Sequence, residues 1–326
     1  MKYNKRFEPE RVESFESNKG SPSTVGDQRE GSVYVYEDKV VLAVNVALAT
    51  GRPLLVRGPS GSGKSSLARN VANNLRWRYY EKVISSRTQA RDLLWQVDLL
   101  HRLHDAQIPG KEFEADFTPY IQPGVLWWAF NRESAKRRGV DPTQSTVGAP
   151  LKDPNQGHEA TQAVVLLDEI DKADPDVPNN LLVPLGSLQF QVEETQAKVE
   201  TSAENAPLVF ITTNDERELP TAFLRRCVEI QLPKITRPWL LEVGKAHFPE
   251  IDHDKLESVA NCMASQDNEE RDDSQIPSPA EYIDTVRACD RLKVWPPGPG
   301  EPQDSVWQHL SQITLWKHGR QGERTT

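Results

Sequence analysis

The residues with the clearest chemistry form a glycine-rich loop between a short apolar stretch and a helix-like pattern. Glycines allow backbone N–H groups to converge on phosphate oxygens, and the N-terminus of the following helix adds its dipole. A lysine in such a loop offers positive charge to the β- and γ-phosphates, and a serine after it offers a hydroxyl to Mg²⁺. The sequence fits this pattern, G-x-x-x-x-G-K-[ST], with Gly58, Pro59, Ser60, Gly61, Ser62, Gly63, Lys64 and Ser65, and Ser66 follows directly. The spacing therefore predicts a nucleotide-binding loop.

Two acids follow an unbroken apolar stretch further along the chain. In AVVLLDEID, Asp168 and Glu169 come directly after the apolar residues. Such a run without alternation is typical of a central parallel strand, whose end would lie beside the phosphates. Asp168 is then expected to hold Mg²⁺ through water, and Glu169 to polarise the attacking water. A solvated acidic strand end is the alternative, and the glycine-rich loop makes it the weaker one.

A polar pair ends the next apolar stretch, PLVFITTND. An amide at the tip of a central strand can contact the γ-phosphate and orient the water. Asn214 is the better candidate for this role and Thr213 the second. The alternative interpretation is a cap at the end of the strand.

Two adjacent arginines follow the short segment TAFL. Arg225 and Arg226 lie far in sequence from the loop and the acids. One interpretation is an arginine finger that reaches the γ-phosphate bound by a neighbouring subunit, and Arg226 is the better candidate for it. The other is a basic pair on the surface.

The elements that must position these residues alternate along the chain. Helical spacing covers residues 38–50 and the stretch KSSLARNVANNL, and apolar strand-like stretches are LLVR, EKVISSRT, AVVLLDEID, PLVFITTND and VEIQLP. After residue 233 only helical patterns follow. We therefore expect an α/β domain with a parallel five-stranded sheet and a small C-terminal helical domain.

Composition shifts suggest the domain boundaries. Residues 1–32 are expected to form a flexible tail, and residues 33–233 the α/β domain, with an insert around residues 103–161. Within that insert, residues 139–161 have the composition of a flexible excursion. Residues 234–294 are expected to form the helical lid, and residues 295–326 a C-terminal tail that includes a helix-like stretch.

Bulk properties exclude several classes of protein. No stretch approaches the ~18 consecutive apolar residues of a membrane span, and the N-terminus lacks the apolar core of a secretory signal. The three cysteines are widely spaced, which suits the cytoplasm. A net charge of −9 disfavours a broad nucleic-acid surface. Since no N/T-K-x-D tetrapeptide for guanine follows the loop, ATP is preferred over GTP.

Together these motifs resemble those of an AAA+ ATPase, and more closely the MoxR branch of the helix-2-insert clade. The resemblance covers about residues 33–293 and rests on GPSGSGKS, VVLLDEID, ITTND, AFLRRC, ALATGRPLLVRG and SSRTQARDLLWQVD. It implies a P-loop fold that binds and hydrolyses Mg²⁺–ATP in an oligomeric, most often hexameric, ring. It also implies a chaperone-like role, in which a partner protein, often one with a von Willebrand factor A domain, is remodelled or activated.

One position departs from that family. MoxR-type proteins often carry a sensor-2 arginine at the start of a lid helix, where this sequence has Ala280 in Ser278-Pro279-Ala280-Glu281. Arg287 could replace it only if the lid is rotated. Two other functions therefore stay open. One is a nucleic-acid-linked motor, for which residues 136–138 supply a local basic cluster, and the other is a slow ATP-dependent switch.

Overall fold

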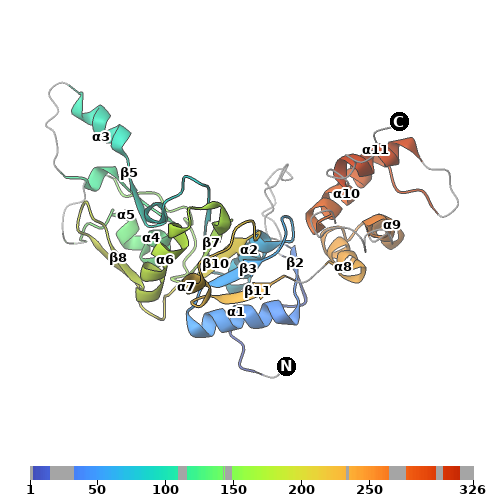
Figure 1. Ribbon diagram of the computed structural model, residues 1–326, viewed down its shortest axis with the longest axis horizontal. Helices are drawn as coiled ribbons and strands as arrows, with labels where there is room; N and C mark the ends of the chain where they lie inside the picture. Colours follow the sequence, from blue (N-terminus) through green and yellow to red (C-terminus); the bar gives the residue numbers. More distant parts are fainter. Residues whose placement is uncertain are drawn as a thin grey trace. The chain divides into compact units, whose positions relative to one another are not determined.

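The computed structural model describes residues 3–14, 33–108, 116–141, 143, 149–232, 235–263, 277–298 and 304–315. Figure 1 shows the elements in sequence colours. Contacts within the chain divide it into two compact units. Unit 1 contains Met1–Glu8, Asp38–Arg57 and Ala68–Ile230, and unit 2 contains Pro9–Glu37, Gly58–Leu67 and Gln231–Thr326.

A five-stranded parallel sheet forms the centre of unit 1 and confirms the predicted α/β class. Its strand order is β11-β3-β10-β7-β4. Every residue of β10 is buried, and so are the first five of β7, which explains why both strands read as apolar runs. The strands are β3 (Leu54–Arg57), β4 (Arg78–Val83), β7 (Ala163–Asp168), β10 (Leu208–Thr213) and β11 (Val228–Gln231).

The register of the sheet brings the predicted polar residues to one edge. Arg57, the last residue of β3, pairs with Thr213, the last of β10. Further along the same edge, Asp168 at the end of β7 pairs with Val83 of β4. Because parallel strands all end on the same side, the loops after β3, β7 and β10 leave the sheet together.

Helices pack on this sheet in unit 1. Helix α1 contacts β3, and α4 contacts β4 and β7. Helix α1 begins at an acid, Asp38, and ends where Gly51 takes φ +65° and donates its N–H to the Ala47 carbonyl. The helices are α1 (Asp38–Thr50), α2 (Lys64–Leu75), which continues from unit 2, α4 (Val125–Phe130), α5 (Arg132–Lys136), α6 (Asp176–Ser187), α7 (Thr221–Leu224) and the short η3 (Ile170–Lys172).

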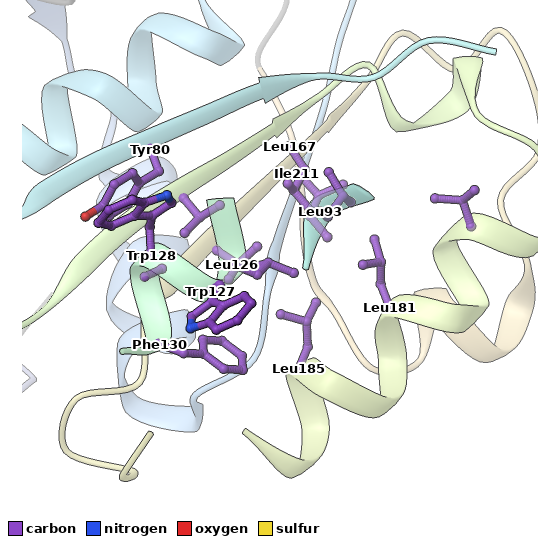
Figure 2. Close-up of a cluster of buried hydrophobic side chains, with 14 of the residues drawn as sticks. Tyr80, Leu93, Leu126, Trp127, Trp128, Phe130, Leu167, Leu181, Leu185 and Ile211 are labelled. Carbon is purple, nitrogen blue, oxygen red and sulfur yellow. The ribbon is translucent and has the colours of Figure 1, made fainter. Parts of the chain in front are cut away.

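Large aromatic and aliphatic side chains fill the core between the sheet and these helices. Figure 2 shows Trp127 and Phe130 of α4 beside Leu185 of α6, and Leu167 and Ile211 of the sheet above them. Trp127 is fully buried, and its indole N–H donates to the Ser134 hydroxyl. The tryptophan pair at residues 127–128 is therefore part of the core.

The segment at residues 90–105, amphipathic in sequence, does not form one helix. Trp95 lies in β5 (Trp95–Val97), which pairs antiparallel with β6 (Ile121–Pro123). Asp98 then caps a separate helix α3 (Leu99–Ala106) by accepting the His101 N–H at 2.9 Å. A partner strand distant in sequence thus breaks the helical pattern. Short turns η1 (Ala90–Leu93) and η2 (Thr118–Tyr120) flank the two strands.

The stretch at residues 139–161 contains well-packed residues in its described part. Asp153 is 7% exposed and forms an ion pair with Arg132. The Asn155 side chain accepts the Tyr79 N–H at 2.9 Å and donates to the Tyr79 carbonyl at 2.8 Å. Asn155 therefore covers part of β4, the edge strand of the sheet, which the composition did not predict. Residues 142 and 144–148 lie outside the described residues.

The stretch FQVEETQAKVE, between α6 and β10, has a sequence pattern compatible with either a hairpin or a short helix. The structure has a hairpin, in which β8 (Gln189–Gln191) pairs antiparallel with β9 (Lys198–Glu200). Phe190 of β8 stacks on Trp95 with ring centroids 5.9 Å apart. The Trp95 indole donates to Glu194 at 2.7 Å, so the hairpin is attached to β5.

Among the residues that the structure describes, unit 2 contains four helices that follow the sheet in sequence and a two-stranded sheet that precedes it. The helices are α8 (Arg237–His247), α9 (His253–Met263), α10 (Pro279–Leu292) and α11 (Ser305–Thr314), which agrees with the helical patterns in the sequence. Tyr282 and Val286 of α10 are fully buried against α8 and α9. The strands are β1 (Val12–Ser14) and β2 (Val33–Val35).

The described part of residues 1–32 differs from the flexible tail that composition suggested. Phe7 is 1% exposed, and its N–H and carbonyl are both hydrogen-bonded to the Asn45 side chain in unit 1. In unit 2, β1 pairs antiparallel with β2, and Arg11 forms an ion pair with Glu242 of α8 at 2.8 Å. These contacts join residues far apart in sequence, which composition cannot reveal. Residues 1–2 and 15–32 lie outside the described part.

Candidate nucleotide site

The glycine-rich loop connects β3 to α2, as the sequence predicts. Gly61 and Gly63 have φ values of +75° and +94°, which only glycine adopts without strain. Lys64 is 6% exposed, and its ammonium donates to the carbonyls of Gly58 at 2.7 Å and Pro59 at 2.8 Å. The lysine thus stands inside the curve of the loop. Helix α2 begins at this residue, so its N-terminus faces the loop.

The loop has the properties that a polyphosphate requires. Ser62 Oγ is buried and has no hydrogen-bond partner in the described part of the chain. A Cβ atom on Gly58 would lie 3.0 Å from that oxygen, so a side chain there would narrow the loop. Backbone N–H groups, the ammonium and the Ser65 hydroxyl are donors and ligands suited to phosphate and Mg²⁺. These residues fit a bound Mg²⁺–nucleotide, which would supply the γ-phosphoryl group for transfer to water.

The N-terminus of α10 lies against this loop within unit 2. The Ala280 N–H donates to the Gly61 carbonyl at 3.3 Å, and a Cβ on Gly61 would lie 2.5 Å from Ser278 Oγ. Ser278 and Glu281 cap the helix reciprocally. Ala280 is therefore in contact with the loop itself. Arg287 forms an ion pair with Asp284 of the same helix at 3.2 Å.

Asp168 and Glu169 are both organised by Thr212 of the neighbouring strand. The Thr212 hydroxyl donates to Asp168 Oδ1 and accepts the Glu169 N–H at 2.9 Å. Thr212 is fully buried, whereas both acids are partly exposed at the sheet edge. Glu169 has φ +62°, a left-handed conformation that is uncommon for a residue with a side chain. The sequence analysis did not identify Thr212, because a threonine in a buried strand gives no signal of its own.

Asn214 lies beside Glu169, whereas the Thr213 side chain contacts a different group. Asn214 Nδ2 is 3.5 Å from Glu169 Oε1, while the Thr213 hydroxyl accepts the Asp215 N–H at 3.0 Å. The other carboxylate oxygen of Glu169 accepts from Lys172 at 2.7 Å. This hydrogen bond raises the pKa of Lys172. The structure thus brings Glu169, Asn214 and Lys172 together.

Asp171 connects the turn after β7 to the loop after β10. It is 3% exposed, and its Oδ2 accepts the backbone N–H groups of Asn214 and Glu216, both at 3.1 Å. Its Oδ1 is buried without a partner in the described chain. The sequence analysis assigned no role to this acid. Its burial and its two acceptor contacts show that it holds the Asn214 backbone in place.

Arg225 and Arg226 lie apart from these contacts. Both are exposed, directly after α7, and neither side chain forms a hydrogen bond or an ion pair with the residues that the structure describes. Their backbone is fixed, because Arg225 N–H donates to Thr221 and Arg226 N–H to Phe223. Phe223 is fully buried and anchors the helix. The structure thus presents both guanidinium groups to solvent on a rigid base.

The cysteines and possible metal clusters add no further chemistry. Burial raises the pKa of the Cys227 thiol to about 12, although the charges of Arg52 and Arg57 act in the opposite direction. Within the described ranges, no three His, Cys, Asp or Glu side chains gather as metal ligands do. None of the helices described has the length and apolar character needed to cross a membrane.

The fold and these motifs together define a P-loop nucleotide-binding protein. The sheet is parallel, a phosphate-binding loop follows its first central strand, and the acids lie at the same edge of the sheet. Residues 53–227 match the family described as AAA domain (dynein-related subfamily). The chain belongs to this family, and this membership indicates that it is an ATPase. Proteins of the family generally use ATP and Mg²⁺.

Other comparisons give more distant likenesses. A mutant of RuvB from Thermotoga maritima is 13% identical, with 86% of this chain and 70% of that chain covered and a TM-score of 0.46. Thermotoga maritima RuvB, described as a Holliday junction branch migration motor, is 15% identical, with coverages of 85% and 67% and a TM-score of 0.43. No curated protein matches the chain in sequence.

Proposed function

We propose that this chain is an ATP hydrolase of the MoxR type that assembles into a ring, hexameric by family resemblance, and remodels or activates a partner protein. In this proposal, residues 33–233 carry the nucleotide site and residues 234–294 form the lid. The observation that carries it is the pair of exposed arginines on a rigid base, whose side chains have no partner among the described residues, in a protein whose acids are already held in place.

Each site residue has a separate role in the proposal. Lys64 and the loop N–H groups bind the phosphates, and Ser65 and Asp168 hold Mg²⁺, the latter through water. Glu169 polarises the attacking water, and Asn214, which lies beside it, orients that water. To polarise the water, Glu169 must break its ion pair with Lys172. Because both side chains of this pair are partly exposed, breaking it costs little free energy.

The arginines complete the site of a neighbouring copy. A cation that reaches the γ-phosphate stabilises the charge of the transition state, and this effect is large for an arginine finger. Arg226 has no partner among the described residues that it would have to leave before binding a phosphate. Hydrolysis at one site would then depend on the conformation of the next subunit, and this is how a ring transmits force to a partner.

Helix α3 supports the binding of a partner protein. Leu99, Leu100 and Leu103 are 64%, 81% and 57% exposed, and none of the residues of the helix is buried. Several exposed leucines on one short helix are typical of an interaction surface. A protein with a von Willebrand factor A domain is the partner class that the MoxR resemblance suggests.

The shared site is tested by mixing two inactive variants. Arg226→Ala should reduce ATP turnover by about 10³-fold, the lower end of the range for a finger, while ATP still binds through the intact loop. Lys64→Ala should be inactive because it loses the phosphate contact. Mixed rings place an intact site next to an intact finger, so equal amounts of the two variants should recover part of the turnover. Phosphate release and isothermal titration with ATP are the measurements.

Arg225→Ala is the matched control, since it removes the same charge one residue earlier. If the mixture of Arg226→Ala and Lys64→Ala stays inactive, the shared site is refuted. If phosphate release is equally negligible in wild type and Glu169→Gln, the chain is a slow switch instead. Stimulation of turnover by DNA would favour a nucleic-acid-linked motor over a protein remodeller.

A further inference from the structure

Arg57 occupies a junction between three strands at the functional edge of the sheet. It is the last residue of β3 and directly precedes the phosphate-binding loop. Its Nη1 forms an ion pair with Asp215, and its Nε lies 2.8 Å from Glu229 Oε1 on β11. The Arg57 side chain is 19% exposed, which is less than either carboxylate. One guanidinium group thus joins the loop after β10 to strand β11.

Each of its two partners follows a residue with a proposed role. Asp215 comes directly after Asn214 and has φ +60°, so its position determines how the backbone leaves Asn214. Glu229 lies three residues after Arg226, beyond Cys227 and Val228. The Val228 N–H donates to the Pro53 carbonyl at 2.8 Å, which fixes the start of β11 beside β3. A shift of Asp215 would therefore be passed through Arg57 to β11, the strand that begins shortly after the two arginines.

We infer that Arg57 is a positioning residue that couples the loop carrying Asn214 to the segment carrying Arg226 in the same subunit. When ATP binds and Asn214 turns toward its γ-phosphate, Asp215 moves, and Arg57 transmits this movement through Glu229 to residues 225–227. The nucleotide in one site thereby adjusts the finger offered to the next. This inference rests on the proposed function, because it assigns Arg226 to a neighbouring site.

The geometry favours coupling over a purely structural contact. Asp215 and Glu229 are 41% and 45% exposed, and ion pairs of this exposure are weak and can exchange. The backbone hydrogen bonds of β11 contribute more to the stability of the fold than these ion pairs do. The two carboxylates contact different nitrogens of a planar fork, an arrangement that a lysine ammonium cannot reproduce. Arg57→Lys thus separates bridging from simple charge neutralisation.

The test measures the finger segment directly and does not require a ring. Hydrogen–deuterium exchange of the peptide covering residues 221–231 is followed with and without Mg²⁺–ATP in an Arg226→Ala background, which removes finger contacts between copies. We expect ATP to change the exchange rate of this peptide at least threefold. The change should fall to less than half in Arg57→Met and in Arg57→Lys. It should persist in Arg52→Met, an exposed arginine at the other end of β3.

Glu229→Gln provides a second route to the same result, since it breaks the link at its far end and is partly exposed. Glu218→Gln, at an exposed position of the loop, is its control. An undiminished response in Arg57→Met or Glu229→Gln overturns the inference, and so does a parent peptide that does not respond to ATP. Full rescue by Arg57→Lys overturns the bridging role.

Turnover separates this inference from the proposed function. Arg57→Met is added to the Glu169→Gln variant, which still binds ATP through its intact loop but donates only its finger, and the double variant is mixed with Arg226→Ala. Recovered turnover should be at least threefold lower than with Glu169→Gln alone, although every active site keeps its own Arg57. No recovery with Glu169→Gln alone refutes the shared site, while the exchange experiment still decides the role of Arg57. Equal recovery in both mixtures refutes the coupling.

Discussion

The hydroxyl of Thr212 donates a hydrogen bond to Asp168, so the strand that leads to Asn214 also holds the acid at the end of β7. The same oxygen accepts the backbone N–H of Glu169. One buried side chain therefore fixes the carboxylate proposed to hold Mg²⁺ and the backbone of the residue proposed to polarise water. The positions of the two acids thus depend on the neighbouring strand β10 and not only on β7, the strand at whose end they lie.

Thr212→Val tests this dependence, because valine keeps the shape of threonine and removes its hydroxyl. Unsatisfied buried groups cost about 1–3 kcal/mol, so we expect ATP turnover to fall roughly 10- to 100-fold. ATP affinity, which the loop provides, should change less. Thr213→Val is the control, since Thr213 is equally buried and its hydroxyl accepts the Asp215 N–H. Equal losses in both variants would contradict the prediction.

Asp171→Ala should lower both stability and turnover. It leaves the N–H groups of Asn214 and Glu216 without their acceptor, which we expect to cost about 1–3 kcal/mol of unfolding free energy. Turnover should fall because the Asn214 backbone is released. Asp171→Asn keeps one acceptor oxygen and should recover part of both losses. Chemical denaturation and phosphate release measure them, with the exposed neighbour Asp174→Ala as control; an Asp171→Ala protein as stable and active as wild type would refute the role.

Two glycine-to-alanine changes should have opposite effects. At Gly61, φ is +75° and a Cβ would lie 2.5 Å from Ser278 Oγ, so Gly61→Ala should weaken ATP binding and lower the melting temperature. Gly186 lies near the end of α6 with no atom within 4 Å of an added Cβ. Gly186→Ala should stabilise the protein by about 0.4–1 kcal/mol. Thermal unfolding distinguishes them, and a stabilised Gly61→Ala variant would contradict this description of the loop.

The Cys227 thiol should react slowly at neutral pH. Its pKa is about 12 in the folded protein, against 9.0 as its ordinary value, so the folded state holds the proton more tightly than the unfolded state. Stability from this group is complete below pH 9 and is lost as pH rises toward 12. Site-resolved alkylation should therefore accelerate above pH 9 in the folded protein, and Cys227→Ala should show a shallower loss of stability there. Fast alkylation of Cys227 at pH 7 would contradict the burial.

Local patterns predicted the elements that depend mainly on local interactions. The bounds of α1, β3 and α2 agree with the sequence patterns because an acid, a glycine and the loop itself begin or end each one. The structure of residues 90–106 was harder to predict from local patterns, since β5 forms only by pairing with β6. The described contacts of Phe7 with Asn45 were hidden for the same reason, because both partners are far apart in sequence.

The sequence by itself determined the phosphate-binding loop, the two acids, the polar strand tip and the paired arginines, because each is a short pattern whose residue types are required by chemistry. Only the tertiary structure decided what holds them. Thr212, Asp171 and Arg57 contact partners on neighbouring strands or in the loops that follow them. Strand order and register, rather than residue type, bring those partners within hydrogen-bonding distance. The contact of Ala280 with the loop is likewise a product of packing.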